Sequence, residues 1–295
     1  MPLKTDWRIF KKQDLKKRNL VIFGTRPEAI KMAPLVKVFS QHQDFFETKV
    51  CVTAQHREML DQVLDFFDIV PDYDLNLMKP GQNLNGLTAS VILSLKPVLE
   101  EFEPDYVYVH GDTTTKMAAS IASFYAGTKI CHVEAGLRTF DMSSLFPEEM
   151  NRTVTGVVAN FHFAPTSTSK ANLIRENKDA DSILITGNTV IDTLELSVKK
   201  VNDPFFKNEE IEMLKSTLKP TKKTVLVTGH RRENHGQGFI DICHALKQIA
   251  QENRDCQIIY PVHLNPNVQQ PVYTILKDVE NIELISPLSY PAFVW

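Results

Sequence analysis

The chain of 295 residues is 43% hydrophobic and 23% charged, a composition typical of folded globular proteins that excludes an intrinsically disordered chain. Its length is sufficient for two domains. The formal net charge of −3 and the sequence pI of about 6.3 provide no overall positive field, so we expect no nucleic acid partner.

Cysteine spacing and hydropathy indicate the cellular compartment in which the protein resides. The four cysteines have no CxxC spacing and fall within apolar stretches, as reduced core thiols do: Cys51, Cys131, Cys243 and Cys256. No apolar run approaches the roughly 20 residues that cross a bilayer, and no signal-peptide pattern opens the chain. We therefore expect a cytoplasmic protein without a membrane segment.

Residues 1–18 form a basic segment, which we expect to be an N-terminal extension or an additional short helix. From Asn19 onward, short apolar runs alternate with longer segments of helical period, the pattern of βαβ units around a parallel sheet. We expect strands near residues 19–24, 48–53, 105–110, 129–133, 161–164 and 182–185. We expect helices near residues 28–42, 56–67, 85–102, 114–126, 149–159, 167–176 and 188–201.

A second series follows a charged connector near residues 202–223. We expect its strands near 224–228, 256–262 and 281–285, and its helices near 237–252 and 267–278. The sequence thus predicts an α/β fold with two Rossmann-like domains, the first over 19–190 and the second, with its linker, over 191–295. Three strands are few for a parallel sheet, and the chain stops in the apolar stretch 289–295, so we expect the second domain to be incomplete.

A strand–turn–helix corner at residues 21–31 has the features of an anion site. Gly24 permits a sharp turn, and the helix start that follows exposes backbone N–H groups. Arg26 and Lys31 add positive charge beside them. A phosphate is the expected ligand, and the alternative is that Arg26 caps a turn and Lys31 only pairs with Glu28 one helical turn back.

Other ionisable residues stand where predicted strands end, which is where ligands bind in open α/β sheets. They are Asp112 after the strand near 105–110, Glu134 after 129–133, His230 after 224–228 and His263 after 256–262. Each has a local alternative: Asp112 caps the next helix, and Glu134 pairs with Arg138 four residues on. His230 is an ordinary loop histidine in its alternative, and His263 a partly buried histidine with its hydrogen bonds satisfied. Glu148 follows Pro147 at a helix start, where acids are favoured without any function.

Sequence patterns for cofactors are missing. The histidines and acids lack the spacing of a zinc motif, and no GxGxxG is present, so we expect neither a metal nor a dinucleotide. A GxSxG elbow and a Walker A loop are also absent.

Taken together, the motifs resemble the non-hydrolysing UDP-N-acetylglucosamine 2-epimerases, enzymes of the two-Rossmann-domain glycosyltransferase-B type. The resemblance runs from about Asn19 to Trp295 through FGTRPEAIKMAPLV, VTAQHREMLDQVL, HGDTTT, HVEAGLRT, PEEMNR, ITGNTVID, VTGHRREN and YPVHLNPNV. It implies an enzyme, in homodimer form and without a cofactor, that interconverts UDP-N-acetylglucosamine and UDP-N-acetylmannosamine. UDP is eliminated as the C2 proton is removed, and it re-adds to 2-acetamidoglucal after protonation from the opposite face.

Site residues follow from the same resemblance. By motif position, Asp112, Glu134 and Glu148 are implied to be the acid–base set. His230 is implied to contact the departing diphosphate. Arg26, Lys31 and Phe293 are implied to bind the substrate.

The family also has a regulatory site for a second UDP-N-acetylglucosamine, whose pattern is matched by Gln55, His56, Gln82 and His263. Glu58 and Gly81 stand where some bacterial members carry Gln and Arg. The resembling enzymes continue past the last residue of this chain with a Ser-Gly-Gly turn and a Glu that bind the nucleotide. The alternative hypothesis is therefore a catalytically incompetent UDP-sugar-binding fragment or pseudoenzyme.

Overall fold

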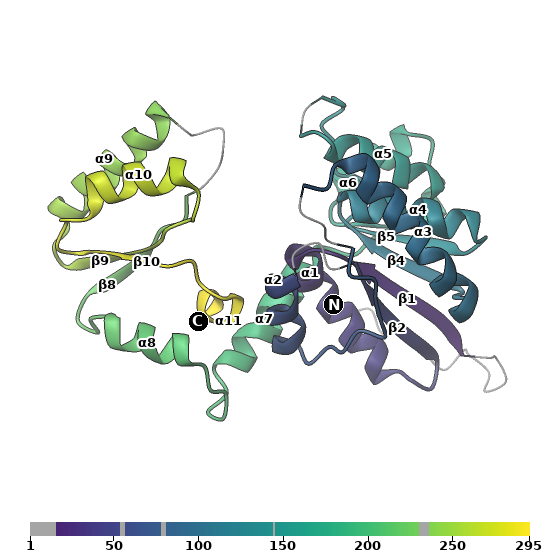
Figure 1. The fold of residues 1–295 in the computed structure, drawn as a ribbon, viewed down its shortest axis with the longest axis horizontal. Coiled ribbons are helices and arrows are strands. Elements are labelled where there is room, and N and C mark those ends of the chain that lie inside the picture. Colours follow the sequence, from purple (N-terminus) through teal and green to yellow (C-terminus); the bar gives the residue numbers. More distant parts are fainter. Residues whose placement is uncertain (1–15, 54–56, 78–80, 144, 230–235) are drawn as a thin grey trace. The chain divides into compact units, whose positions relative to one another are not determined.

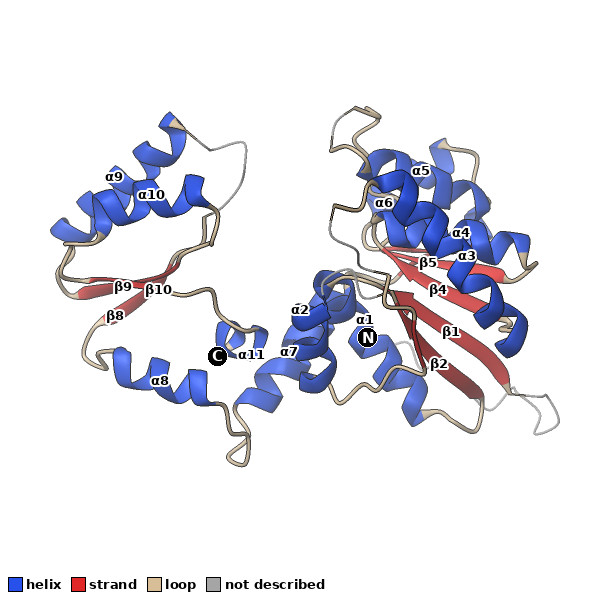
Figure 2. Cartoon of the chain, viewed as in Figure 1, coloured by secondary structure: helices blue, strands red, loops and turns tan. Residues whose placement is uncertain are grey.

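The computed structural model describes residues 16–53, 57–77, 81–143, 145–229 and 236–295, and internal contacts divide the chain into two compact units after Leu196. Each unit contains a parallel sheet with helices packed on it (Figures 1 and 2). The predicted α/β class is confirmed.

Unit 1 is built on a seven-stranded sheet in the order β3-β2-β1-β4-β5-β6-β7, in which all neighbouring strands run parallel. The strands are β1 (Lys17–Phe23), β2 (Phe46–Val52), β3 (Tyr73–Asp74), β4 (Tyr106–His110), β5 (Lys129–Val133), β6 (Phe161–Ala164) and β7 (Ile183–Ile185). The strand order reverses between β1 and β4, and ligands of such sheets bind outside the carboxyl ends of the strands at this reversal. The fold therefore directs attention to the turns after these two strands.

The helices of this part of the chain are α1 (Arg26–Gln41), α2 (Arg57–Phe66), α3 (Leu84–Phe102), α4 (Thr114–Tyr125), α5 (Glu148–Val158), α6 (Ser167–Arg175), the 3₁₀ turn Ala180–Ser182 and α7 (Thr189–Val201). Side chains alternate across the sheet, as strand geometry requires. Val107 and Val109 of β4 face the core that α3 and α4 cover, whereas the ring of Tyr108 lies 5.2 Å from Phe39 of α1. Both faces of the central strands are thereby buried.

Unit 2 contains a three-stranded sheet in the order β10-β9-β8. Its elements are α8 (Glu209–Thr217), β8 (Lys223–Leu226), α9 (Gln237–Glu252), β9 (Cys256–Pro261), α10 (Pro266–Leu276), β10 (Ile282–Ile285) and α11 (Tyr290–Val294). Ile258 and Tyr260 of β9 share one core with Phe239 of α9 and Val272 of α10, so both helices cover the same face (Figure 1). None of the helices formed by the described residues of either unit has the length and apolar composition needed to cross a bilayer.

Four elements were not predicted, one of which is the 3₁₀ turn Ala180–Ser182. Helix α8 lies inside the predicted charged connector. It forms there because Asn208 caps its first turn and because Ile211 and Leu214, three residues apart, are buried on one side of it. Strand β3 has only two residues, too few to show a period, and α11 is a single short helix. Strand β1 also begins two residues before Asn19, since Lys17 and Arg18 already pair with β2.

Candidate active site

The β1–α1 turn is fixed by a buried glutamate. Glu28, 3% exposed, accepts hydrogen bonds from the Gly24 and Thr25 N–H groups at 3.0 and 2.9 Å, and Thr25 also serves as the N-cap of α1. The hydroxyl of Thr113, in the β4–α4 turn, donates to its other oxygen at 2.5 Å. Burial raises the pKa of Glu28, and these donors counteract that effect. The alternative pairing of Glu28 with Lys31 is wrong, because the Glu28 carboxylate holds the two turns together.

Gly24 is required by close packing at this corner. A Cβ atom at this position would lie 2.0 Å from the Thr53 hydroxyl oxygen, which follows β2. Arg26, the first residue of α1, is partly exposed, and its guanidinium makes no ion pair with another described residue. The corner thus presents a cation and the amino end of a helix, the arrangement that binds phosphate groups.

Glu134, directly after β5, is held by two side chains from distant parts of unit 1. Lys31 of α1 donates from Nζ to both of its carboxylate oxygens, at 2.9 and 2.7 Å, and Asn188 Nδ2 donates to Oε2 at 2.9 Å. The alternative salt bridge with Arg138 is wrong: Arg138 instead binds Glu176 through two hydrogen bonds of 2.6 and 2.8 Å. The fold therefore fixes the Glu134 carboxylate in one orientation.

The backbone of Glu134 is strained as well. Its φ of 62° lies in the left-handed region, which non-glycine residues rarely adopt and which occurs preferentially at functional sites. The neighbouring His110 ring lies 3.8 Å from the carboxylate. Burial, followed by the charge of Lys31, lowers the pKa of His110 to about 3, so the ring is neutral and this contact is not an ion pair.

Asp112, two residues after β4, is bound by an arginine from α5. Arg152 donates to Asp112 Oδ2 from Nε at 3.1 Å and from a terminal nitrogen at 2.6 Å, and its other terminal nitrogen binds Glu149 at 2.9 Å. The cap of α4 is Thr113, so the interpretation of Asp112 as a helix cap is wrong. The turns that carry Asp112 and Glu134 adjoin one another, since the Gly111 N–H donates to the carbonyl of Val133 at 3.0 Å.

Two consecutive glutamates begin α5 and have different environments. Glu149 is 2% exposed and accepts hydrogen bonds from the Thr139 and Phe140 N–H groups, both at 3.0 Å. Burial alone would raise the pKa of Glu149, but these N–H donors and Arg152 lower it below its ordinary value. Glu148 is partly exposed, and no hydrogen bond or ion pair from the described residues engages its carboxylate. Glu148 is therefore the glutamate that remains available to a ligand.

The other predicted site residues are distributed over both units or lie outside the description. His230, Gln55 and His56 are outside the described residues. Gln82 precedes α3 in unit 1 and is partly exposed. In unit 2, His263 follows β9 and accepts a hydrogen bond from the Asn265 N–H at 3.1 Å, and Phe293 is an exposed residue of α11.

Sequence reasoning missed three residues around the carboxylates. Arg152 belongs to the PEEMNR motif, but a position inside a predicted helix gave no sign that it would reach the turn after β4. Asn188 follows β7 and so had the same signal as the residues that were selected: a polar side chain where a strand ends. Lys116 occurs in the first turn of α4 after two threonines, where nothing in the sequence distinguishes a buried lysine from an exposed one.

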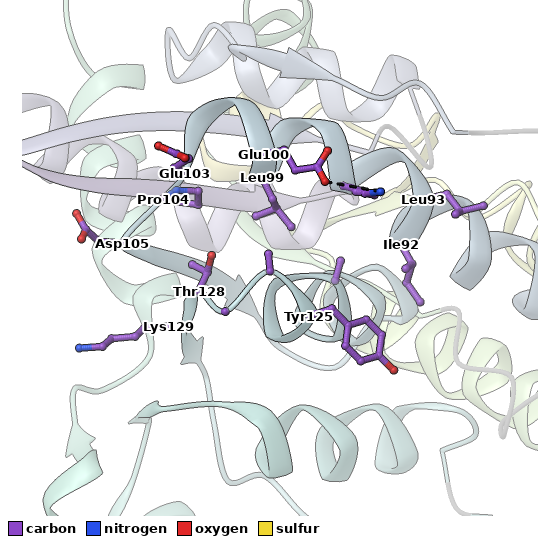
Figure 3. Close-up of a pocket in the computed structure, with 14 residues that line it drawn as sticks. Ile92, Leu93, Leu99, Glu100, Glu103, Pro104, Asp105, Tyr125, Thr128 and Lys129 are labelled. Atoms are coloured by element: carbon purple, nitrogen blue, oxygen red, sulfur yellow. Dashed lines mark ion pairs between the residues drawn. The ribbon is translucent and has the colours of Figure 1, made fainter.

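An open hollow of about 810 Å³ lies at the other edge of the sheet, between the C-terminal parts of α3 and α4 (Figure 3). Its lining includes Asp105, which precedes β4, and Lys129, which begins β5. The hollow is thus at the amino ends of these strands, whereas the carboxylates follow their carboxyl ends. Among the residues that the structure describes, no cluster of histidine, cysteine and acidic side chains is arranged to hold a metal ion.

Comparison with known proteins gives consistent matches. The protein-family model for UDP-N-acetylglucosamine 2-epimerase matches residues 39–295. The UDP-N-acetylglucosamine 2-epimerase of Escherichia coli (strain K12) is 57% identical over 276 residues, which cover 94% of this chain and 73% of the relative. The crystal structure of UDP-GlcNAc 2-epimerase from Neisseria meningitidis bound to UDP-GlcNAc superposes with a TM-score of 0.85 at 48% identity, covering 94% of this chain and 74% of that one. The Methanocaldococcus jannaschii enzyme in complex with UDP-GlcNAc and UDP superposes with a TM-score of 0.73 at 28% identity, over 94% and 75% of the two chains.

Proposed function

The chain belongs to the UDP-N-acetylglucosamine 2-epimerase family, and we propose that it is an isomerase that interconverts UDP-N-acetylglucosamine and UDP-N-acetylmannosamine. The structural observation that carries the proposal is a pair of carboxylates on adjoining turns, each held by its own cation. Lys31 holds Glu134, and Arg152 holds Asp112. Fixed carboxylates of this kind are the groups that proton transfer at a sugar carbon requires.

The reaction consists of an elimination and its reversal. A carboxylate takes the proton from C2, the C2–H electrons form the C1=C2 double bond, and UDP leaves C1 with the electrons of the C1–O bond. A carboxylic acid then protonates C2 of the 2-acetamidoglucal on the opposite face, and UDP adds back to C1. The sum involves no net oxidation, so the two steps need only acids, bases and groups that hold the diphosphate.

We assign the acid–base steps to Asp112, Glu134 and Glu148. Glu134 is supported by its strained backbone and by the two donors that fix both carboxylate oxygens. Asp112 is supported by its position beside the β1–β4 reversal and by its partial exposure. Glu148 is supported by its position at the start of α5 and by a carboxylate that none of the described residues engages.

The nucleotide and regulatory assignments rest on the family. Arg26 and the amino end of α1 are proposed to bind the diphosphate, a role that suits their position after β1. His230 and Phe293 are proposed to complete substrate binding. Lys31 is proposed to contribute to diphosphate binding without direct contact, because its ammonium group already donates hydrogen bonds to Glu134. Gln55, His56, Gln82 and His263 are proposed to bind a second UDP-N-acetylglucosamine.

Incubation with UDP-N-acetylglucosamine in D2O tests the reaction. We expect UDP-N-acetylmannosamine to appear in the proton spectrum and deuterium to enter C2 of both sugars. A preparation that leaves the C2 proton unexchanged would overturn the proposal. Release of UDP together with free N-acetylmannosamine would instead indicate a hydrolytic reaction.

A homodimer in the cytoplasm is proposed for the working enzyme. All four cysteines are free thiols, which suits a reducing compartment. Sedimentation equilibrium at micromolar concentration tests the dimer, and a monomeric mass over the whole concentration range would contradict it.

A further inference from the structure

Lys116 is a buried cation that the proposed reaction does not use. It lies in the first turn of α4 and is 1% exposed. Its Nζ donates one hydrogen bond, to the backbone carbonyl of Asn151 at 3.2 Å. Within the described part of the chain, no carboxylate oxygen lies within ion-pair distance of this ammonium.

This environment is costly for a positive charge. A buried ammonium loses its hydration, and one neutral acceptor compensates only a small part of that loss. The amino end of a helix is itself partially positive and adds to the cost. Burial lowers the pKa of Lys116 to about 7, while the charge of Asp112 acts in the opposite direction. Lys116 therefore changes between its protonated and neutral forms near neutral pH.

Charged and titratable groups from four elements face Lys116: Glu28 of α1, His110 and Asp112 at the end of β4, His132 of β5 with Arg138 after it, and Arg152 of α5. Burial holds both histidines neutral, because it lowers the pKa of His110 to about 3 and that of His132 well below its ordinary value. Arg138 is compensated by its two bonds to Glu176.

The remaining charges do not balance without Lys116. Asp112 and Glu149 both depend on the single guanidinium of Arg152. Asn151 connects the groups, because its side chain donates to the Asp112 carbonyl at 2.9 Å while its own carbonyl accepts from Lys116. Asp112, Glu149, Arg152 and a protonated Lys116 together have no net charge, and a deprotonated Lys116 leaves them with one net negative charge. An ionised Glu28 adds one further negative charge in either state.

We propose that Lys116 is a counter-charge of the Asp112 carboxylate and that its positive charge strengthens binding of the anionic nucleotide sugar to unit 1. This inference rests on the proposed function, since it takes the ligand to be a UDP-sugar. Lys116 is a positioning residue, because its buried side chain acts through Asp112 and touches no ligand. A unit charge in a partly buried site changes the affinity for an anion there roughly tenfold.

The test measures KM and Kd for UDP-N-acetylglucosamine between pH 6 and pH 9. The diphosphate of this ligand is a diester, so its charge stays constant over the range, and the uracil N–H of the ligand begins to ionise only at the upper end. For the unsubstituted chain we expect both constants to rise about tenfold across the range, with an inflection near pH 7. Lys116→Met should show the high value at every pH, with a smaller change in kcat.

Lys116→Gln separates charge from hydrogen bonding, because glutamine retains a donor for the Asn151 carbonyl. The proposal predicts that it behaves like Lys116→Met, and wild-type constants in this variant would overturn the proposal. The control is Lys96→Met, which removes an exposed lysine of α3 whose partner is Glu100 at 3.6 Å. It should leave the pH profile unchanged.

Binding and turnover distinguish failure of this inference from failure of the proposed function. A chain that binds UDP-N-acetylglucosamine with a constant Kd from pH 6 to pH 9 overturns the role of Lys116, whether or not turnover occurs. A chain that binds with the expected pH dependence but exchanges no C2 proton supports this role and overturns the epimerase proposal.

Discussion

Lys31 Nζ lies 2.9 and 2.7 Å from the two carboxylate oxygens of Glu134, although 103 residues separate them in the sequence. The side chains are 25% and 10% exposed, so the pair is less screened than a surface salt bridge. Removing one partner of such a pair leaves a poorly solvated charge, which costs more than the pair itself contributes. The two side chains therefore act as one unit.

Glu134→Gln is expected to lower kcat by about 100-fold or more, because an amide cannot transfer the C2 proton. Lys31→Met should lower kcat by a comparable order, since it frees the carboxylate from its fixed position. Because both changes disable one unit, the double variant should be no slower than Glu134→Gln alone. Steady-state kinetics of the three variants measure this coupling.

The control for this cycle is Lys37→Met on the same helix, where the lysine lies 3.7 Å from Asp68 and both side chains are more than a third exposed. It should leave kcat within about twofold, as exposed ion pairs contribute little. Additive losses in the Lys31 and Glu134 double variant would contradict a common unit.

Asp112→Asn should lower kcat much more than it raises KM, because the change removes a proton acceptor and keeps the shape of the side chain. Arg152 retains a carbonyl oxygen as its partner, so binding should change only a few-fold. The measurement is a full kinetic profile with UDP-N-acetylglucosamine as substrate.

Equal losses in kcat and in affinity would make Asp112 a structural residue. Asp255→Asn is a suitable control, because this exposed carboxylate lies 3.7 Å from Lys223 at the start of β8. It should leave both constants unchanged.

Much of the site was predictable because its residues follow strands. Gly24, Asp112 and Glu134 stand directly after apolar runs, and the carboxyl ends of parallel strands converge on one edge of the sheet. Their partners were less visible. Arg152 reaches Asp112 forty positions away, a contact that depends on where α5 packs rather than on local spacing. The φ of Glu134 and the burial of Lys116 are likewise properties of the packed structure.

The bounds of helices and strands could not be predicted where the local sequence signals were weak. Helix α8 has acidic residues through its first turns and buries only two apolar side chains, so its composition resembled a linker. Its cap, Asn208, was the signal that a search for helix starts would have found.

Gly24→Ala should destabilise unit 1 by about 1–3 kcal/mol, because the new methyl group would collide with the Thr53 hydroxyl. Thr53→Ala removes that oxygen, so the double variant should recover part of the lost free energy of unfolding. Urea denaturation followed by circular dichroism gives these values. Gly238→Ala in α9, where a Cβ meets nothing within 4 Å, is the control and should not destabilise. Absence of recovery in the double variant would contradict the steric cause.

The free energy of unfolding should also depend on pH through the titration of Lys116. Its pKa falls from an ordinary value of 10.5 to about 7 on folding, so between these values the unfolded chain binds more protons than the folded one. The free energy of unfolding should therefore rise with pH, by about 4 kcal/mol from pH 7 to pH 10 from this group alone. Below pH 7 both states hold the proton, and the full cost of burying the ammonium remains.

Lys116→Met has no such proton, so its unfolding free energy should lack this rise and should exceed that of the unsubstituted chain at pH 7. Urea denaturation at pH 7, 8.5 and 10 measures both slopes, and titrating groups distant from α4 contribute equally to the two chains. Lys96→Met controls for loss of a lysine as such and should keep the original slope. Parallel curves for the unsubstituted chain and Lys116→Met would show that Lys116 titrates alike in the folded and unfolded states, in which case the α4 site tolerates its charge at no cost.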